Sequence, residues 1–173
     1  MYFIMKKTIK KFGFYGGLTG GLIFAGSHFL DWKMGFGLLE IFGYLAIFTS
    51  LTFVFFGIKH FRDQINNGIV TFGKALGIGL AISAIAGLTI GLLDIIYVTL
   101  INPNFATEYI QYTLEGMKET LTAAEFEIQK AKIVDEMEFF SNPIFSGFFM
   151  FTIVFTFGII ISLISSLILQ RKK

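Results

Sequence analysis

The chain has 173 residues, of which 54% are hydrophobic, 17% aromatic and only 15% charged, and its mean hydropathy is +0.72. This composition excludes an ordinary soluble domain, because such domains carry about 25% charged residues. The formal charge of +2 favours neither nucleic acid nor an acidic substrate as the partner. The absence of cysteine excludes disulfides, thiolate metal sites and cysteine nucleophiles.

Four apolar stretches have about the 20 residues that a helix needs to cross a bilayer. They lie at residues 13–30, 37–58, 74–100 and 144–169. The first follows four lysines, as the apolar part of a signal peptide does, but no small-residue cleavage site closes it. We therefore predict an all-α, polytopic membrane helix bundle with four transmembrane helices, in which residues 1–173 form a single membrane domain.

Positive charge is distributed unevenly over the predicted loops. The N-terminal segment, the loop between the second and third spans, and the C-terminus together hold ten of the 14 basic residues. The opposite side holds four lysines and nine acidic residues. Because short loops rich in Lys and Arg stay in the cytoplasm, both termini are predicted to be cytoplasmic.

The loop at residues 59–74 connects the second and third predicted spans. Asn67-Gly68 is a strong turn signal, so we expect a short interfacial turn. Lys59, Arg62 and Asp63 have two interpretations: a site for phosphate or a lipid headgroup, or residues that only anchor the topology, which is the commoner case.

The segment at residues 104–141 is the only sizeable part predicted outside the membrane. Asn-Pro pairs at 102–103 and 142–143 break the helices at its two ends. Between them we predict an extracytoplasmic helical hairpin, with one helix over about 106–120 and a second that begins at Thr122. Thr122 and Glu125 have the spacing of a capping box.

The second helix of this hairpin carries an apolar stripe on one face. The stripe consists of Phe126, Ile133, Met137 and Phe140. Such a stripe usually packs against a neighbouring helix or the membrane surface, and the alternative is that it binds a partner protein.

Small residues recur at intervals of four in several spans, which allows membrane helices to approach closely. The predicted packing positions are Gly13, Gly17 and Gly21 in the first span, and Gly79, Ser83, Gly87 and Gly91 in the third. We expect the first and third helices to pack together. The same pattern would also serve a homo-oligomer.

Ionisable residues inside a membrane are costly, about 3 kcal/mol for a central Asp, and therefore mark candidate functional sites. Asp94 lies within the third predicted span and Glu40 near the start of the second. His28 and Tyr97 are expected at a similar depth and complete a candidate intramembrane polar site. The site either binds a cation or proton, or is structural, with Asp94 hydrogen-bonded to a Tyr, Ser or Thr of a neighbouring helix.

Signals for enzymatic chemistry are absent from the sequence, which has no HExxH motif, phosphate-binding loop or nucleophile elbow. The two histidines, His28 and His60, are predicted on opposite sides of the membrane and cannot share a metal ion. We therefore predict no enzyme, no catalytic residue, no cofactor and no metal site.

Several motifs follow one another along most of the chain. They are MKKTIKKFGFYGG at 5–17, FFGIKHFRDQINNG at 55–68, FGKA at 72–75, the two Asn-Pro pairs and a closing SLILQRK. In these motifs the chain resembles a bacterial membrane-protein family, domain of unknown function 4199, frequent in Bacteroidetes. The resemblance implies a four-helix protein of the bacterial inner membrane without an assigned activity, and it supplies no binding residue.

The predicted function is a non-enzymatic membrane module, structural or regulatory, that contacts a partner protein through the extracytoplasmic hairpin. The alternative is a small transporter or channel subunit that uses Asp94 as its cation or proton site. Besides the lipid bilayer, the expected partners are a protein at the hairpin or a second copy of the chain.

Overall fold

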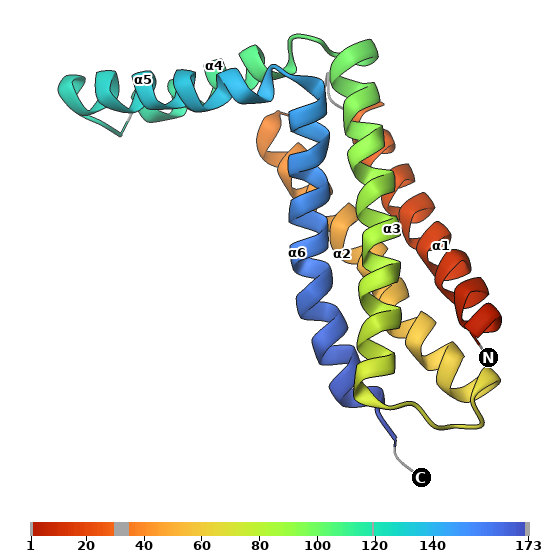
Figure 1. Cartoon of the computed structure of the whole chain (residues 1–173). Coiled ribbons are helices and arrows are strands. Elements are labelled where there is room, and N and C mark those ends of the chain that lie inside the picture. The colour runs from red at the N-terminus through yellow and green to blue at the C-terminus, as the bar shows by residue number, and fades with distance from the viewer. Residues whose placement is uncertain (1, 30–34, 119, 172–173) are drawn as a thin grey trace. The chain divides into compact units, whose positions relative to one another are not determined.

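A computed structural model gives the fold (Figure 1). It describes residues 2–29, 35–118 and 120–171, without the side chains of 2–3, 28–29 and 136–138. These residues form an all-α fold, as predicted. The α-helices are α1 (Tyr2–Phe29), α2 (Phe36–His60), α3 (Phe72–Ile96), α4 (Phe105–Lys118), α5 (Ala123–Phe140) and α6 (Pro143–Leu169).

Three helices are long and apolar enough to cross a membrane: Phe36–Ile65, Phe72–Ile101 and Pro143–Leu169. Only 39%, 44% and 33% of the residues in their most apolar windows are buried within the protein. Helices that are apolar on exposed as well as buried faces are typical of membrane spans. The part of α1 that the structure describes is not among them, because its many glycines and its lysines dilute its apolar residues.

Two spans continue beyond their α-helical part through a π-turn. The segment η2 (Phe61–Ile65) extends α2, and η3 (Tyr97–Ile101) extends α3. The first residue of each π-turn, Phe61 or Tyr97, is a buried aromatic side chain. The helix that contains the predicted second span, 37–58, therefore continues to Ile65, because a π-turn continues the helical backbone while it shifts the hydrogen-bond register.

The chain divides into two compact units, and α3 and α6 contribute to both. The bundle unit comprises Met1–Ile90 and Met150–Lys173, and the hairpin unit comprises Gly91–Phe149. The core of the bundle unit consists of apolar residues from α2, α3, α6 and the loop after α2. The residues are Ile47, Leu51, Val54, Ile58, Phe61, Val70, Ala75, Ile78, Ile82, Ile90, Val154 and Leu169.

Glycines on α1 bring it against both α2 and α3 in the bundle unit. A Cβ atom on Gly13 would lie 2.8 Å from Ile85 of α3, and one on Gly17 would lie 2.6 Å from Thr89. On α2, the carbonyl oxygen of Ser50 would lie 2.8 Å from a Cβ atom on Gly16. Because any side chain at these positions would force the helices apart, the glycine ladder of α1 sets the spacing between these helices.

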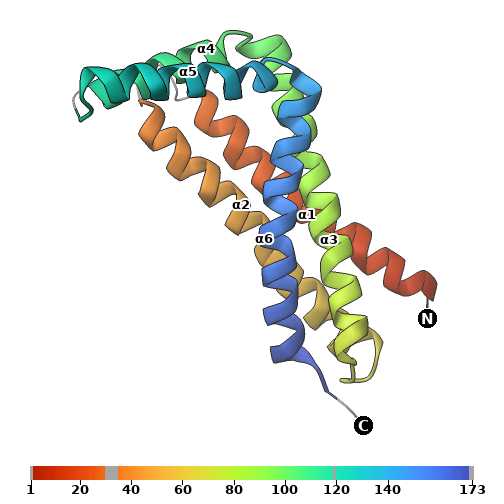
Figure 2. The ribbon, with the colours of Figure 1, turned by 60° about the vertical axis from the view of Figure 1, so that its left-hand side comes forward.

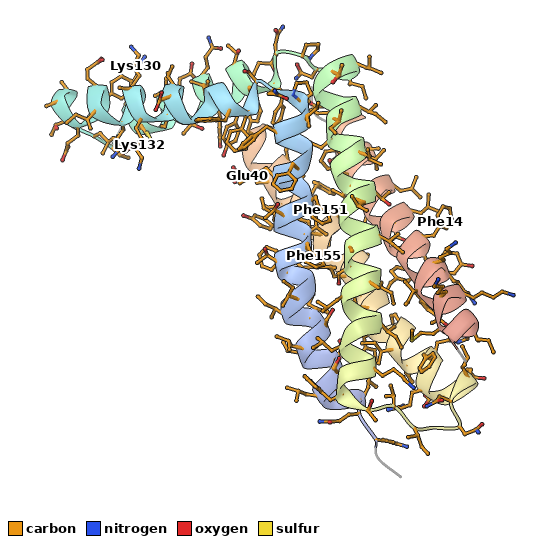
Figure 3. All side chains as sticks on the ribbon, viewed as in Figure 1. Phe14, Glu40, Lys130, Lys132, Phe151 and Phe155 are labelled. Carbon is orange, nitrogen blue, oxygen red and sulfur yellow. The ribbon has the colours of Figure 1, made fainter. Side chains whose placement is uncertain are left out.

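The small residues of α3 lie against α6. Gly79 faces Ser162, and the hydroxyl of Ser83 is 3.4 Å from that of Ser162. Gly87 faces Phe151, which stacks on Phe155 one turn further along α6 (Figure 3). Gly21 of α1 is also buried.

The connection from α2 to α3 is a tight turn, as predicted. Asn67 and Gly68 both have positive φ, at 52° and 79°, and this is the conformation that Asn-Gly pairs favour. The backbone of Val70 then exchanges two hydrogen bonds with that of Arg171, which follows α6. The loop is therefore fixed to the chain end beyond α6.

In the hairpin unit, α4 and α5 lie side by side and run in opposite directions (Figure 2). The Asn-Pro pair before α6 ends the hairpin as expected: the side-chain oxygen of Asn142 accepts the backbone N–H of Ile144 at 3.0 Å, and Pro143 occupies the first helical position.

Candidate functional site

A buried carboxylate of α3 is bound by a hydroxyl of α6 in the hairpin unit. Asp94 is only 7% exposed, and the hydroxyl of Ser146 donates a hydrogen bond to its Oδ2 at 2.6 Å. Ser146 is itself buried. From the sequence we expected a Tyr, Ser or Thr of a neighbouring helix as the donor to Asp94. Which residue donates depends on how α6 lies against α3.

Two glycines allow the close approach that this bond requires. A Cβ atom on Gly147 would lie 2.6 Å from the carbonyl oxygen of Gly91 and would overlap the side chain of Ile95. Ser146 directly precedes Gly147, and Asp94 lies three residues after Gly91. The helix contact and the polar contact are thus parts of one arrangement.

Tyr97, one turn after Asp94, is also buried. Its ring lies edge-on to that of Phe105, with the ring centroids 5.5 Å apart, and Phe105 stacks on Tyr109 at 6.2 Å. These aromatic contacts join the end of α3 to the first turns of α4.

The remaining members of the predicted polar site belong to the bundle unit. Glu40 is exposed near the start of α2 (Figure 3). His28 lies in α1, and its side chain is outside the described residues. The candidate site that can be described is therefore Asp94 with Ser146 and the adjoining Tyr97. The residues that the structure describes contain no group of three His, Asp or Glu side chains able to hold a metal ion.

The predicted loop residues Lys59, Arg62 and Asp63 lie at the end of α2 in the bundle unit. Arg62 is 8% exposed and binds Asp63 through two hydrogen bonds, Nε to Oδ1 at 2.6 Å and Nη2 to Oδ2 at 3.0 Å. Its remaining nitrogen, Nη1, donates to the carbonyl oxygen of Leu169 at 3.3 Å. The guanidinium group thus joins the end of α2 to the last turn of α6, a role that sequence reasoning missed.

The α4–α5 hairpin has an inner apolar seam. Phe126, Ile133 and Phe140 of the predicted stripe are partly buried, and Met137 lies outside the described side chains. The ring of Phe140 packs edge-on against Phe149 of α6, with centroids 4.9 Å apart. Packing against α6 therefore accounts for Phe140, and Phe126 lies under the Lys118 ammonium group, 5.8 Å from the ring centre.

Other apolar side chains of the hairpin remain exposed. Ile128 is 69% exposed, Phe139 62% and Val134 49%. A shallow groove of about 450 Å³ also runs between the helices. It is lined by Ala106, Thr107, Ile110, Ala131, Val134, Asp135 and Ser141.

The start of α5 is fixed by a carboxylate, in a variant of the predicted capping box. Glu125 accepts hydrogen bonds from both the hydroxyl and the backbone N–H of Thr122, at 2.6 and 3.1 Å. The hydroxyl donates to Glu125, whereas in a full capping box its oxygen would accept a backbone N–H. These bonds hold the pKa of Glu125 below the ordinary value of a glutamate.

The fold and its apolar helices define the class: this is an all-α, multi-pass protein embedded in a membrane. The family model described as "Protein of unknown function (DUF4199)" matches residues 11–171. The chain therefore belongs to this family, in agreement with the resemblance found in its motifs. No curated protein and no solved structure matches the chain.

Proposed function

We propose that this protein is a non-enzymatic membrane module, structural or regulatory, of the bacterial inner membrane. In this proposal α1 is a fourth span, both termini are cytoplasmic, and the α4–α5 hairpin contacts a partner protein on the opposite side. The uneven distribution of positive charge supports the orientation.

The exposed apolar side chains of the hairpin carry the proposal. Ile128 and Phe139 present most of their surface outward. None of the side chains of α4 is fully buried. Apolar side chains that remain exposed beside a groove are typical of a protein-binding surface.

The charge of the hairpin indicates which kind of partner fits. Between residues 104 and 141 the chain has eight acidic residues and three lysines. Two of these lysines, Lys130 and Lys132, point to different sides of α5 (Figure 3). A net negative hairpin is repelled by an anionic membrane surface, so we commit to a protein segment that has apolar residues flanked by basic ones.

A site-specific photo-crosslinker in the full chain, expressed at native abundance, tests this proposal. At Ile128 we expect an adduct with a protein that has a basic, apolar segment. At Leu92 of α3, which is 60% exposed in a membrane span, we expect lipid adducts alone. Neutralising two hairpin acids, with Glu127→Gln and Asp135→Asn, should lower the protein adduct several-fold.

Three results would refute the proposed partner: lipid adducts alone at Ile128, adducts between copies of the chain, or a protein adduct insensitive to the two neutralising substitutions. Adducts between copies would instead identify a homo-oligomer.

The competing function is a small transporter or channel subunit that uses Asp94. It requires a carboxylate that exchanges with water, whereas Asp94 is buried and hydrogen-bonded by Ser146, which supports a structural role. Proton and cation flux into liposomes separates the two. Flux by the unmodified protein that is lost in Asp94→Asn would favour the transporter, and no flux by either protein would favour the module.

A further inference from the structure

A basic cluster surrounds the Arg62–Asp63 pair in the bundle unit. It consists of Lys59 on α2, Lys74 on α3 and Arg171 after α6. Lys59 and Arg171 lie close enough to Asp63 to interact with it electrostatically. Three separate elements of the unit thus bring positive charge to one place.

Asp63 does not neutralise this cluster. Both of its carboxylate oxygens are hydrogen-bonded to Arg62, so this pair has no net charge. Apart from Asp31, which lies outside the described residues, the only other acidic residue of the bundle unit is Glu40. Glu40 lies 23 positions earlier on the same helical segment, or about 34 Å away at 1.5 Å per residue. Among the described residues of the bundle unit, the three cations of the basic cluster therefore have no acidic residue nearby other than Asp63, whose charge Arg62 already balances.

Contacts position two of these cations, Arg171 and Lys74. Arg171 is held by two hydrogen bonds between its backbone and that of Val70, at 2.8 and 3.2 Å. The Lys74 Nζ lies 6.0 Å from the centre of the buried Phe61 ring. On α1, the ring of Phe12 lies 5.3 Å from that of His60, so the lysines before Phe12 add charge to the same end of the unit. The three cations thus come from the ends of three helices that meet around the loop between α2 and α3.

The cluster also lies near the ends of two candidate membrane spans. The second span ends at Ile65 and the third begins at Phe72, so Lys59 and Lys74 lie within about two turns of these span ends. Basic residues at this depth interact with anionic headgroups, and each strengthens binding roughly fivefold. Anionic lipids of the surrounding bilayer can therefore reach the cluster directly.

We propose that the basic cluster formed by Lys59, Lys74 and Arg171 binds the phosphate of an anionic phospholipid, with the Arg62–Asp63 pair as its neutral, rigid base. This site lies in the other unit from the proposed partner surface and does not depend on it. The bound lipid would bridge the ends of α2, α3 and α6.

The test is native mass spectrometry of the full chain released from micelles that contain phosphatidylglycerol or phosphatidylcholine. We expect retained phosphatidylglycerol and little phosphatidylcholine. The triple variant Lys59→Gln, Lys74→Gln, Arg171→Gln should bind phosphatidylglycerol at least tenfold more weakly. The matched control removes three positive charges from the hairpin, with Lys118→Gln, Lys130→Gln and Lys132→Gln, and should bind as the unmodified protein does.

A variant that keeps the charges, Lys59→Arg, Lys74→Arg, Arg171→Lys, guards against misfolding and should retain the lipid. Loss of the lipid in this variant, equal binding of both lipids, or equal losses in the triple variant and its control would overturn the proposal. Displacement of the lipid by millimolar inorganic phosphate would also overturn it, since the site would then bind a soluble anion.

Discussion

Substitution of Gly147 by alanine tests whether the close contact of α3 and α6 positions the Asp94–Ser146 hydrogen bond. The added Cβ would lie 2.6 Å from the Gly91 carbonyl oxygen, which is backbone and cannot rotate away. Overpacking of this kind costs about 1–3 kcal/mol. Separation of the helices would also weaken the hydrogen bond between Ser146 and Asp94, and bonds of this type contribute about 0.6 kcal/mol on average in membrane proteins.

The opposing effect is the higher helix propensity of alanine, worth about 1 kcal/mol. We therefore expect Gly147→Ala to lower the free energy of unfolding by about 0.5–2.5 kcal/mol. The matched control is Gly77→Ala on α3, where the new Cβ would meet no atom within 4 Å and should leave stability unchanged or raise it by up to about 1 kcal/mol.

Unfolding in mixed micelles with increasing SDS, followed by circular dichroism, would measure both variants. A Gly147→Ala protein as stable as Gly77→Ala would refute the close contact. A second measurement isolates the hydrogen bond: if Gly147→Ala acts through it, Ser146→Ala should add little further destabilisation to the Gly147→Ala protein.

Three further outcomes are expected. Ser146→Ala should destabilise the protein by about 1–3 kcal/mol in the same SDS titration, because it leaves the Asp94 carboxylate buried without its hydrogen-bond donor. Asp94→Asn should cost less, because the asparagine side chain still accepts a hydrogen bond from the Ser146 hydroxyl. Arg62→Lys should lower the midpoint of thermal unfolding in detergent although it keeps the charge. A compact ammonium group cannot reproduce the planar, two-bond contact with Asp63 together with the bond to the end of α6, so an unchanged midpoint would contradict this role. The contribution of Glu125 to the α5 N-terminus should be complete above the unfolded pKa of about 4.3 and be lost as pH falls through the lowered folded pKa. The protection factors for hydrogen exchange at the start of α5, which correct for the slower intrinsic exchange in acid, should therefore fall at low pH, and Glu125→Gln should largely remove that pH dependence.

The sequence alone determined the apolar spans and most helix boundaries of this protein. Long apolar runs specify membrane helices because a helix satisfies its own backbone hydrogen bonds where the bilayer supplies no water. The Asn-Pro pair before α6 and the Asn-Gly turn after α2 act locally, so their effects were predictable from a few neighbouring residues. The carboxylate at the start of α5 was predictable for the same reason.

Only the tertiary structure decided which polar groups meet. Ser146 is 52 positions from Asp94, and Leu169 is 107 positions from Arg62. Composition shows that such groups need partners, but helices that are apolar on all faces do not reveal which face points inward. The rotation and spacing of the helices select the partners, and these follow from glycine contacts such as that of Gly147 with Gly91, which form only when the helices pack.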